Sequence, residues 1–169
     1  MNMEPDELIE EAVEMGAEEG KPISTENVHT ATWVRMKCKY GCGGYGERLT
    51  CPPYSPQPEK TRMMLDEYEN AVLIHFPSEA EDVKETMVEL EREAFLSGNY
   101  KAFALGAGPC YLCDECKLEK GCVHPRRARP AMEACGIDVY KTAREAGFPI
   151  EVVESRDCSQ DYYGLLLIE

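Results

Sequence analysis

Nine cysteines in 169 residues constrain this chain more than any other feature of its sequence. Eight of them gather in two stretches, residues 38–51 and 110–135. The acidic first residues lack the basic and apolar blocks of a secretion signal, so we expect a cytoplasmic protein. In a reducing compartment, clustered cysteines bind metal more often than they form a disulfide framework. The cysteine pattern therefore predicts metal binding.

The second stretch has the spacing C-x2-C-x2-C at Cys110, Cys113 and Cys116, followed by Cys122. Three thiolates at this spacing reach three corners of one iron–sulfur cube, and a fourth cysteine close to a proline is typical of bacterial ferredoxin sites. The last gap is longer here, and His124 stands between Cys122 and the proline, where it is a candidate substitute ligand. Zinc is the alternative, but a third cysteine at this spacing is surplus to a tetrahedral zinc knuckle.

The first stretch contains Cys38, Cys42 and Cys51, with the spacing C-x3-C-x8-C. This is not the C-x3-C-x2-C spacing of radical enzymes that cleave S-adenosylmethionine, so we do not infer that chemistry. Glycines around Cys42 let the backbone approach a bulky ligand, and prolines directly after Cys51 stiffen the chain. The group predicts a second metal site; the alternative is three buried cysteines that act as small apolar side chains.

The net charge is −14, yet the two segments that hold eight of the cysteines, residues 27–62 and 100–147, are basic. One interpretation is that the acidic helix faces are simply solvated and the basic residues have ordinary surface roles. The other is that seven basic side chains offset charge on the cysteines or receive an anionic ligand: Arg35, Lys37, Lys39, Arg48, Arg126, Arg127 and Arg129. The overall acidity argues against a general nucleic-acid binder, and no apolar run approaches the length of a membrane span. Acidic faces would dock on a basic redox partner protein, at a rate that salt slows.

The hydrophobic pattern predicts an α/β fold: one domain with about five strands in a mixed sheet, packed helices and two cysteine-rich loops. Residues 1–26 are expected to form an acidic N-terminal helix, and 27–169 a single cysteine-rich metal-binding α/β domain. Within these, the predicted strands are 31–38, 71–76, 100–105, 150–153 and 163–168. The predicted helices are 5–19, 59–68, 78–96 (started by a capping box at Ser78 and Glu81), 131–135 and 138–146. Both cysteine loops would follow a strand, and they could therefore meet at one end of the sheet.

Three segments, residues 34–56, 106–116 and 129–139, resemble a family of predicted metal-binding, cysteine-rich proteins. That family is found in anaerobic bacteria and methanogenic archaea, and its function is unknown. The resemblance covers roughly residues 30 to 169. It implies metal binding through these cysteines, and it implies no particular reaction.

The ligand count suggests two [4Fe-4S] clusters, which need eight thiolates. Cys110, Cys113 and Cys116 would hold one cluster, and Cys38, Cys42 and Cys51 the other. Cys122 and Cys135 would complete the two sets, and which of them serves which cluster is open. The expected function is electron transfer or cluster delivery to a protein redox partner.

Two alternatives stand beside this expectation. In one, a single cluster with an open iron site makes the protein an enzyme, or an enzyme subunit, that acts on a small anionic or sulfur substrate. In the other, zinc stabilises a module that only binds a partner. None of these three hypotheses assigns a role to Cys158, which stands beside an acidic residue.

Overall fold

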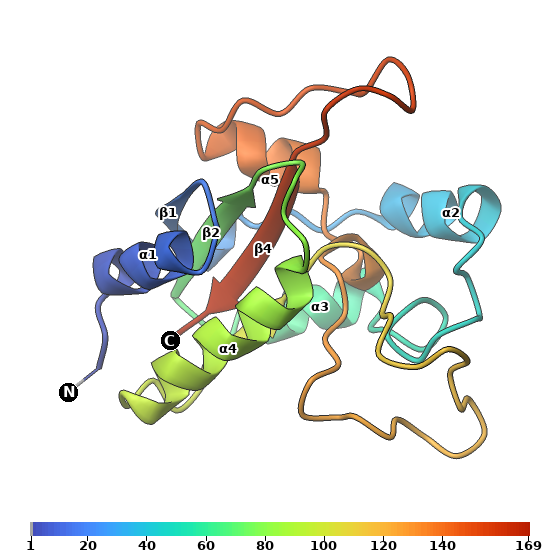
Figure 1. The fold of residues 1–169 in the computed structure, drawn as a ribbon, viewed down its shortest axis with the longest axis horizontal. Coiled ribbons are helices and arrows are strands. Elements are labelled where there is room, and N and C mark those ends of the chain that lie inside the picture. Colours follow the sequence, from blue (N-terminus) through green and yellow to red (C-terminus); the bar gives the residue numbers. More distant parts are fainter. Residues whose placement is uncertain (1) are drawn as a thin grey trace.

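The computed structural model describes residues 2–169, which form a sheet covered by helices on both faces (Figure 1). Within these residues the sheet has four strands in the order β1-β2-β4-β3. The strands are β1 (Glu19–Ser24), β2 (Asn70–Phe76), β3 (Phe103–Leu105) and β4 (Tyr162–Leu167). All three neighbouring pairs are antiparallel. The α/β class is confirmed, whereas the expectation of five strands in a mixed sheet is wrong.

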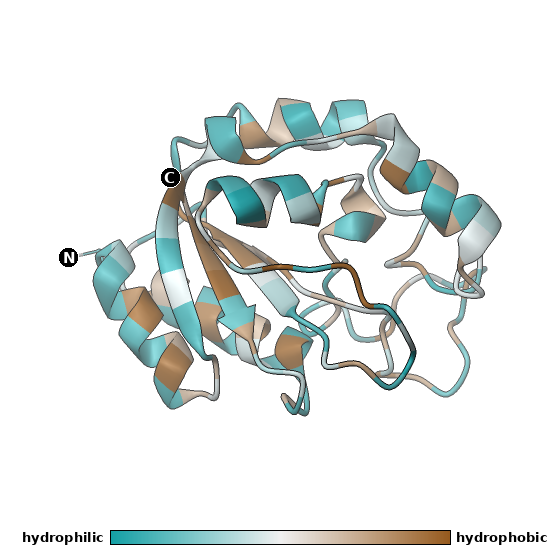
Figure 2. Ribbon diagram, turned by 90° about the horizontal axis from the view of Figure 1, so that it is seen from above, coloured by the Kyte–Doolittle hydropathy of each residue, from teal (hydrophilic) through white to brown (hydrophobic). Residues whose placement is uncertain are grey.

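Helices α1 (Pro5–Glu14) and α4 (Val83–Leu96) contribute side chains to the core on one face of the sheet. The core on the other face takes side chains from α3 (Pro58–Leu65), the short helix η2 (Glu133–Cys135) and α5 (Val139–Glu145). Figure 2 shows the hydrophobic strands between these helices, whose outer surfaces are largely hydrophilic. None of the helices within residues 2–169 has the length and apolar character needed to cross a membrane.

The central strands β2 and β4 send alternate side chains into the two cores. Leu73 and Leu165 belong to one core, and Ile74 and Leu166 to the other. A strand that is buried on both faces has a continuous run of apolar residues rather than an alternation of apolar and polar residues. This is why residues 71–76 and 163–168 were recognisable as strands, and the structure confirms both to within one residue.

Residues 31–38 were predicted as a strand, and this prediction is wrong. Ala31 caps α2 (Thr32–Gly41) and the other seven residues lie in this helix, which buries Val34 and Arg35 and leaves Met36 half exposed. The alternation of apolar and basic residues in this segment therefore does not match the pattern of buried and exposed side chains. The first cysteine group consequently follows a helix and not a strand.

Other predicted boundaries also changed. Helix α1 ends at Glu14 and not at Glu19. After a turn, residues 19–24 form the edge strand β1, which was not predicted. Residues 150–153 contain no strand. Helix α4 starts after Asp82, whose carboxylate accepts a hydrogen bond from the Glu85 amide, so the capping box at Ser78 is wrong. The strand predicted at 100–105 is shortened to β3, and the helix predicted at 131–135 is shortened to η2. Helices α3 and α5 lie where helices were expected.

Two loops without helix or strand carry most of the cysteines. The first loop, residues 42–57, joins α2 to α3, and the second loop, residues 106–132, joins β3 to η2. A bridge between Gly106 and Ala131 brings the two ends of the second loop together. Both loops lie at the end of the molecule away from the N- and C-termini (Figure 1).

Gly136→Ala is expected to lower the free energy of unfolding by about 2–4 kcal/mol, as measured by chemical denaturation. Gly136 has a φ of +77°, and a Cβ there would lie 2.5 Å from the Pro58 ring. Gly46→Ala is the matched control, because Gly46 has a φ of +76° and no atom within 4 Å of the added carbon. The control should lose only about 1–2 kcal/mol. Equal losses would show that the Pro58 contact is unimportant.

Candidate metal centre

The second loop folds four thiols around one small cavity. Cys110, Cys113, Cys116 and Cys122 all line a cavity of about 30 Å³, together with His124. The space between these thiols is narrow, so the loop would rearrange when a metal group binds. Cys122 is exposed and the other three are half-buried, so the site is close to the protein surface.

The first cysteine group lines a much larger cavity. Cys38 lies in α2, Cys42 caps the end of that helix, and Cys51 lies in the first loop. All three border a cavity of about 550 Å³, hereafter the wide cavity. A Cβ added to Gly44 would lie 3.6 Å from the Cys42 Sγ and 3.9 Å from the Cys51 Sγ, so the two sulfurs face a common point. Glycine at this position leaves that space free.

The two loops contact each other directly. The Arg48 Nε donates to the Cys110 carbonyl over 2.6 Å, and the Leu49 amide donates to the Cys116 Sγ over 3.4 Å. Within the first loop, the Gly44 amide donates to the Cys42 Sγ, also over 3.4 Å. Hydrogen bonds to cysteine sulfur are among the features that set the potential of iron–sulfur clusters. The two cysteine loops therefore contact each other, as expected. The expectation assumed that both loops follow a strand, whereas only the second loop does.

A lysine from α4 reaches the region between the two cysteine groups. The Lys84 Nζ is buried and has no hydrogen-bond partner within the described part of the chain. Its electrostatic neighbours include Cys110, Cys51 and Glu133, and burial lowers its pKa. A buried ammonium group without a partner is costly, so this position fits a site that holds negative charge.

Sequence reasoning missed Lys84. It lies in an acidic stretch, far along the chain from either cysteine group. The available signal was weak: residues 63–99 hold ten acidic residues and only two basic ones, and Lys84 is one of the two.

Two thiols of the first group, Cys38 and Cys51, hold their protons more firmly in the metal-free chain than a free thiol does. Burial raises the pKa of Cys38, with a further contribution from Cys42, and burial likewise raises the pKa of Cys51. Glu133 also lines the wide cavity, to which its side chain is exposed. A metal ligand must be a thiolate. Binding of a cationic metal group at these cysteines would therefore release protons.

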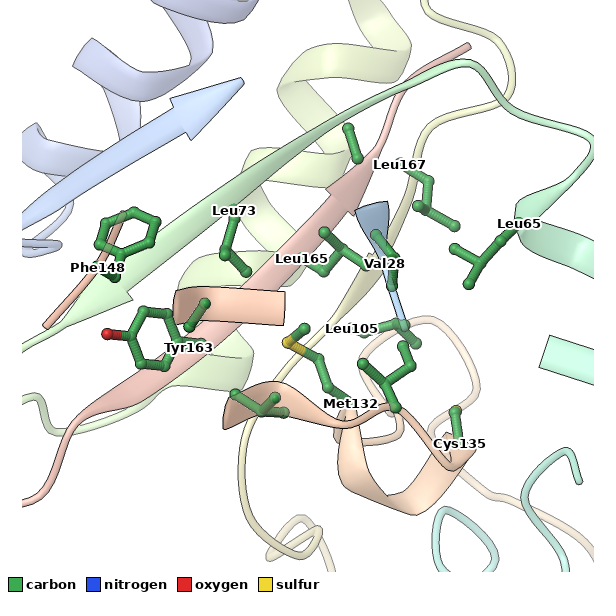
Figure 3. Packing of buried hydrophobic residues seen from close by; sticks show 14 of the residues in the cluster. Val28, Leu65, Leu73, Leu105, Met132, Cys135, Phe148, Tyr163, Leu165 and Leu167 are labelled. Atoms are coloured by element: carbon green, nitrogen blue, oxygen red, sulfur yellow. The ribbon is translucent and has the colours of Figure 1, made fainter. Parts of the chain in front are cut away.

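Cys135 lies apart from the other predicted ligands. It is 1 % exposed and belongs to the core cluster that contains Leu65 and Ile137 (Figure 3). It lines neither the wide cavity nor the small cavity of the second loop. Its carbonyl accepts a hydrogen bond from the Thr61 hydroxyl over 2.6 Å, and burial raises the pKa of its thiol to about 12.

Several of the basic residues have structural partners. Arg35 is 8 % exposed and donates to the carbonyls of Ser55, Pro56 and Ala134, which ties α2 to the end of the first loop and to η2. Arg129 forms a two-pronged ion pair with Glu91, with N–O distances of 2.8 and 2.6 Å. Arg129 is therefore neutralised by Glu91 rather than by a bound anion. Arg35 is held by carbonyl groups, and its charge still favours the thiolate form of Cys38 against the effect of burial, as one of the two expected roles requires.

The donor set fits a metal group, although the cysteines do not yet converge on one point. Within residues 2–169, no three His, Cys, Asp or Glu side chains come close enough together to hold a single ion. Four thiolates on one zinc ion lie about 4 Å apart, whereas a cluster spreads its ligands over several irons. Six thiols in the two adjacent loops and Cys38 in α2 supply soft ligands, and the buried Lys84 ammonium group beside them supplies balancing charge. Binding would draw the ligands inward and order the loops.

Fold and site together define a cysteine-rich α/β protein with two cysteine-bearing loops at one end of its sheet. The chain belongs to the family described as predicted metal-binding protein (DUF2284), which matches residues 21–168. This confirms the predicted family, and its description supports metal binding. No curated protein and no solved structure matches the chain.

Proposed function

We propose that this protein is an iron–sulfur protein that transfers electrons to, or delivers clusters to, a partner protein. One [4Fe-4S] cluster would be held by Cys110, Cys113, Cys116 and Cys122, and a second by Cys38, Cys42 and Cys51. The supporting observation is the gathering of these seven thiols in α2 and in two loops that meet beside the buried Lys84 ammonium. A [4Fe-4S] cluster accepts and releases one electron at a time.

The exposure of the second loop supports exchange with a partner protein. Tyr111 is 77 % exposed and Val123 is 57 % exposed, and the nearby Cys122 is exposed as well. A large exposed apolar group rimmed by charged residues is common at protein contacts. The partner would therefore contact this loop.

The acidic surface would act at longer range. Helix α1, with exposed acidic residues such as Glu10 and Glu14, lies at the other end of the molecule. Its charge would steer a basic partner during approach without contacting it at the cysteine loops. Salt should then slow association.

Zinc at the second loop is the second candidate, and a specific observation favours it. The cavity among the four thiols is small, about 30 Å³, so drawing them together around one zinc ion would change the loop less than enclosing a four-iron cluster would. A structural zinc ion held by four cysteines stabilises a fold directly. In that case the second loop would be a stabilised contact surface and not a redox site.

The metal content of the protein distinguishes these candidates. We expect protein purified without oxygen to contain about eight iron and about eight acid-labile sulfide per chain, and to be brown. Elemental analysis with a sulfide assay measures both quantities. About one zinc with four iron would assign zinc to the second loop, and zinc without sulfide would contradict the iron–sulfur proposal.

A further inference from the structure

The wide cavity is much larger than a site for a metal ion needs to be. Its volume of about 550 Å³ lies in the range of small-molecule sites. Cys38, Cys42 and Cys51 form one part of its wall. Further parts come from α2 and the two loops, and the wall opposite comes from η2, from α5 and from residues 150–163, so the cavity extends from the thiols towards the sheet.

The lining of the cavity indicates which kind of molecule it would take. Most of its surface is apolar, and aromatic side chains contribute from four places: Trp33, Tyr45, Tyr140 and Tyr162. Its charged residues are four acids and one lysine: Glu133, Asp138, Glu151, Asp161 and Lys37. An excess of acidic groups repels anions. The cavity therefore suits a neutral or cationic molecule with an apolar or aromatic body.

The thiol count at this cavity is three. The four thiols of the second loop line their own small cavity, and Cys135 is packed in the apolar core. Each four-iron cluster needs four ligands. The first cysteine group therefore lacks a fourth thiol at the point where the wide cavity begins.

We propose that Cys38, Cys42 and Cys51 form a three-thiolate cluster site, and that the wide cavity binds a small neutral or cationic molecule. A donor atom of that molecule would complete the ligand set. This inference rests on the proposed iron–sulfur function and adds a binding activity to it. The donor atom would be a thiol sulfur, an imidazole-type nitrogen or a hydroxyl oxygen, carried on an apolar body.

The experiment uses the full protein, purified without oxygen, with 4-phenylimidazole as the probe. We expect saturable changes in the electron paramagnetic resonance (EPR) spectrum of the dithionite-reduced protein as the probe is added. Phenylpyrrole has a similar shape but no free nitrogen lone pair, and it should leave the spectrum unchanged.

Neighbouring valines provide a matched pair of variants. Val153 lines the cavity and is 39 % exposed, whereas Val152 is 66 % exposed and does not line it. Val153→Trp should fill the cavity and weaken probe binding at least about tenfold. Val152→Trp should bind like the unaltered protein. Iron and sulfide content should be normal in both variants.

Two further measurements test the ligand count itself. Under ferricyanide, a three-thiolate [4Fe-4S]²⁺ cluster gives one electron to the oxidant and releases one Fe²⁺, which leaves [3Fe-4S]⁺ with its own EPR signal. We expect that signal from about one cluster per chain. Cys135→Ala should keep full iron and sulfide, because the thiol packs in the core and binds no iron.

The outcomes separate this inference from the proposed function. A protein without iron and sulfide would overturn both. A protein with both clusters, but with no spectral response to the probe and no three-iron signal, would overturn the inference alone. Loss of about half the iron in a folded Cys135→Ala variant would also overturn it, because Cys135 would then be the missing ligand.

Discussion

Replacing Cys113 by serine is expected to leave the purified protein with about half of its iron and about half of its acid-labile sulfide. Cys113 lines the small cavity with the other three thiols of the second loop. A serine hydroxyl is a harder and weaker ligand for iron than a thiolate. Cys42→Ser should remove the iron and sulfide of the other cluster. The variant that carries both substitutions should be colourless.

The ninth cysteine provides the control for this experiment. Cys158 is exposed, and its Sγ lies 3.3 Å from the Ser155 hydroxyl in a segment that lines neither cysteine cavity. Cys158→Ser should keep full iron and sulfide. If Cys113→Ser alone removes all iron from a protein that still folds by circular dichroism, the two loops share a single cluster. Unchanged iron content would contradict the assignment of the second loop.

Replacing Lys84 by methionine should have opposite effects on the metal-free and the metal-loaded protein. In the metal-free chain, the buried Nζ has no partner among the described residues, and methionine removes this charge at a similar volume. We expect the free energy of unfolding to rise by about 1–3 kcal/mol. In the loaded protein the ammonium group balances the negative clusters, so its loss should lower their midpoint potentials. Chemical denaturation and a redox titration measure the two effects.

Lys141→Met makes the same charge change on the exposed surface of α5. It should alter the free energy of unfolding by less than about 0.5 kcal/mol and leave both potentials unchanged. If Lys84→Met instead destabilises the metal-free protein and leaves the potentials unaltered, the side chain serves only to pack α4 against Gly106. A Cβ on Gly106 would stand 2.6 Å from the Lys84 Cγ, so that packing is close.

Local sequence patterns determined the parts of the fold that depend on neighbouring residues. The apolar runs of β2 and β4 mark strands buried on both faces, and the apolar period of α4 marks its buried stripe. Asp138 was recognisable as the cap of α5, and its carboxylate accepts from the Lys141 amide over 3.0 Å. The spacing of Cys110, Cys113 and Cys116 likewise predicted that these thiols share a site, and they line one cavity.

Pairing between distant segments decided the rest of the sheet. Strand β1 contains Gly20 and Pro22, which disfavour strands, and it forms because β2 supplies the backbone partners at the sheet edge. Residues 150–153 have the apolar character of a strand but find no partner strand, and they border the wide cavity. Strand direction also depends on how the connections run through space, so an antiparallel sheet was not evident from the order of elements.

For the candidate site, the sequence by itself determined the family and the two groups of cysteines, because ligand spacing within a loop is a local property. Only the tertiary structure decided how the groups combine. It packed Cys135 into the core, opened the wide cavity beside Cys38, Cys42 and Cys51, and brought Lys84 from α4 to both groups. These arrangements depend on how helices pack on the sheet, and no short stretch of sequence encodes that packing.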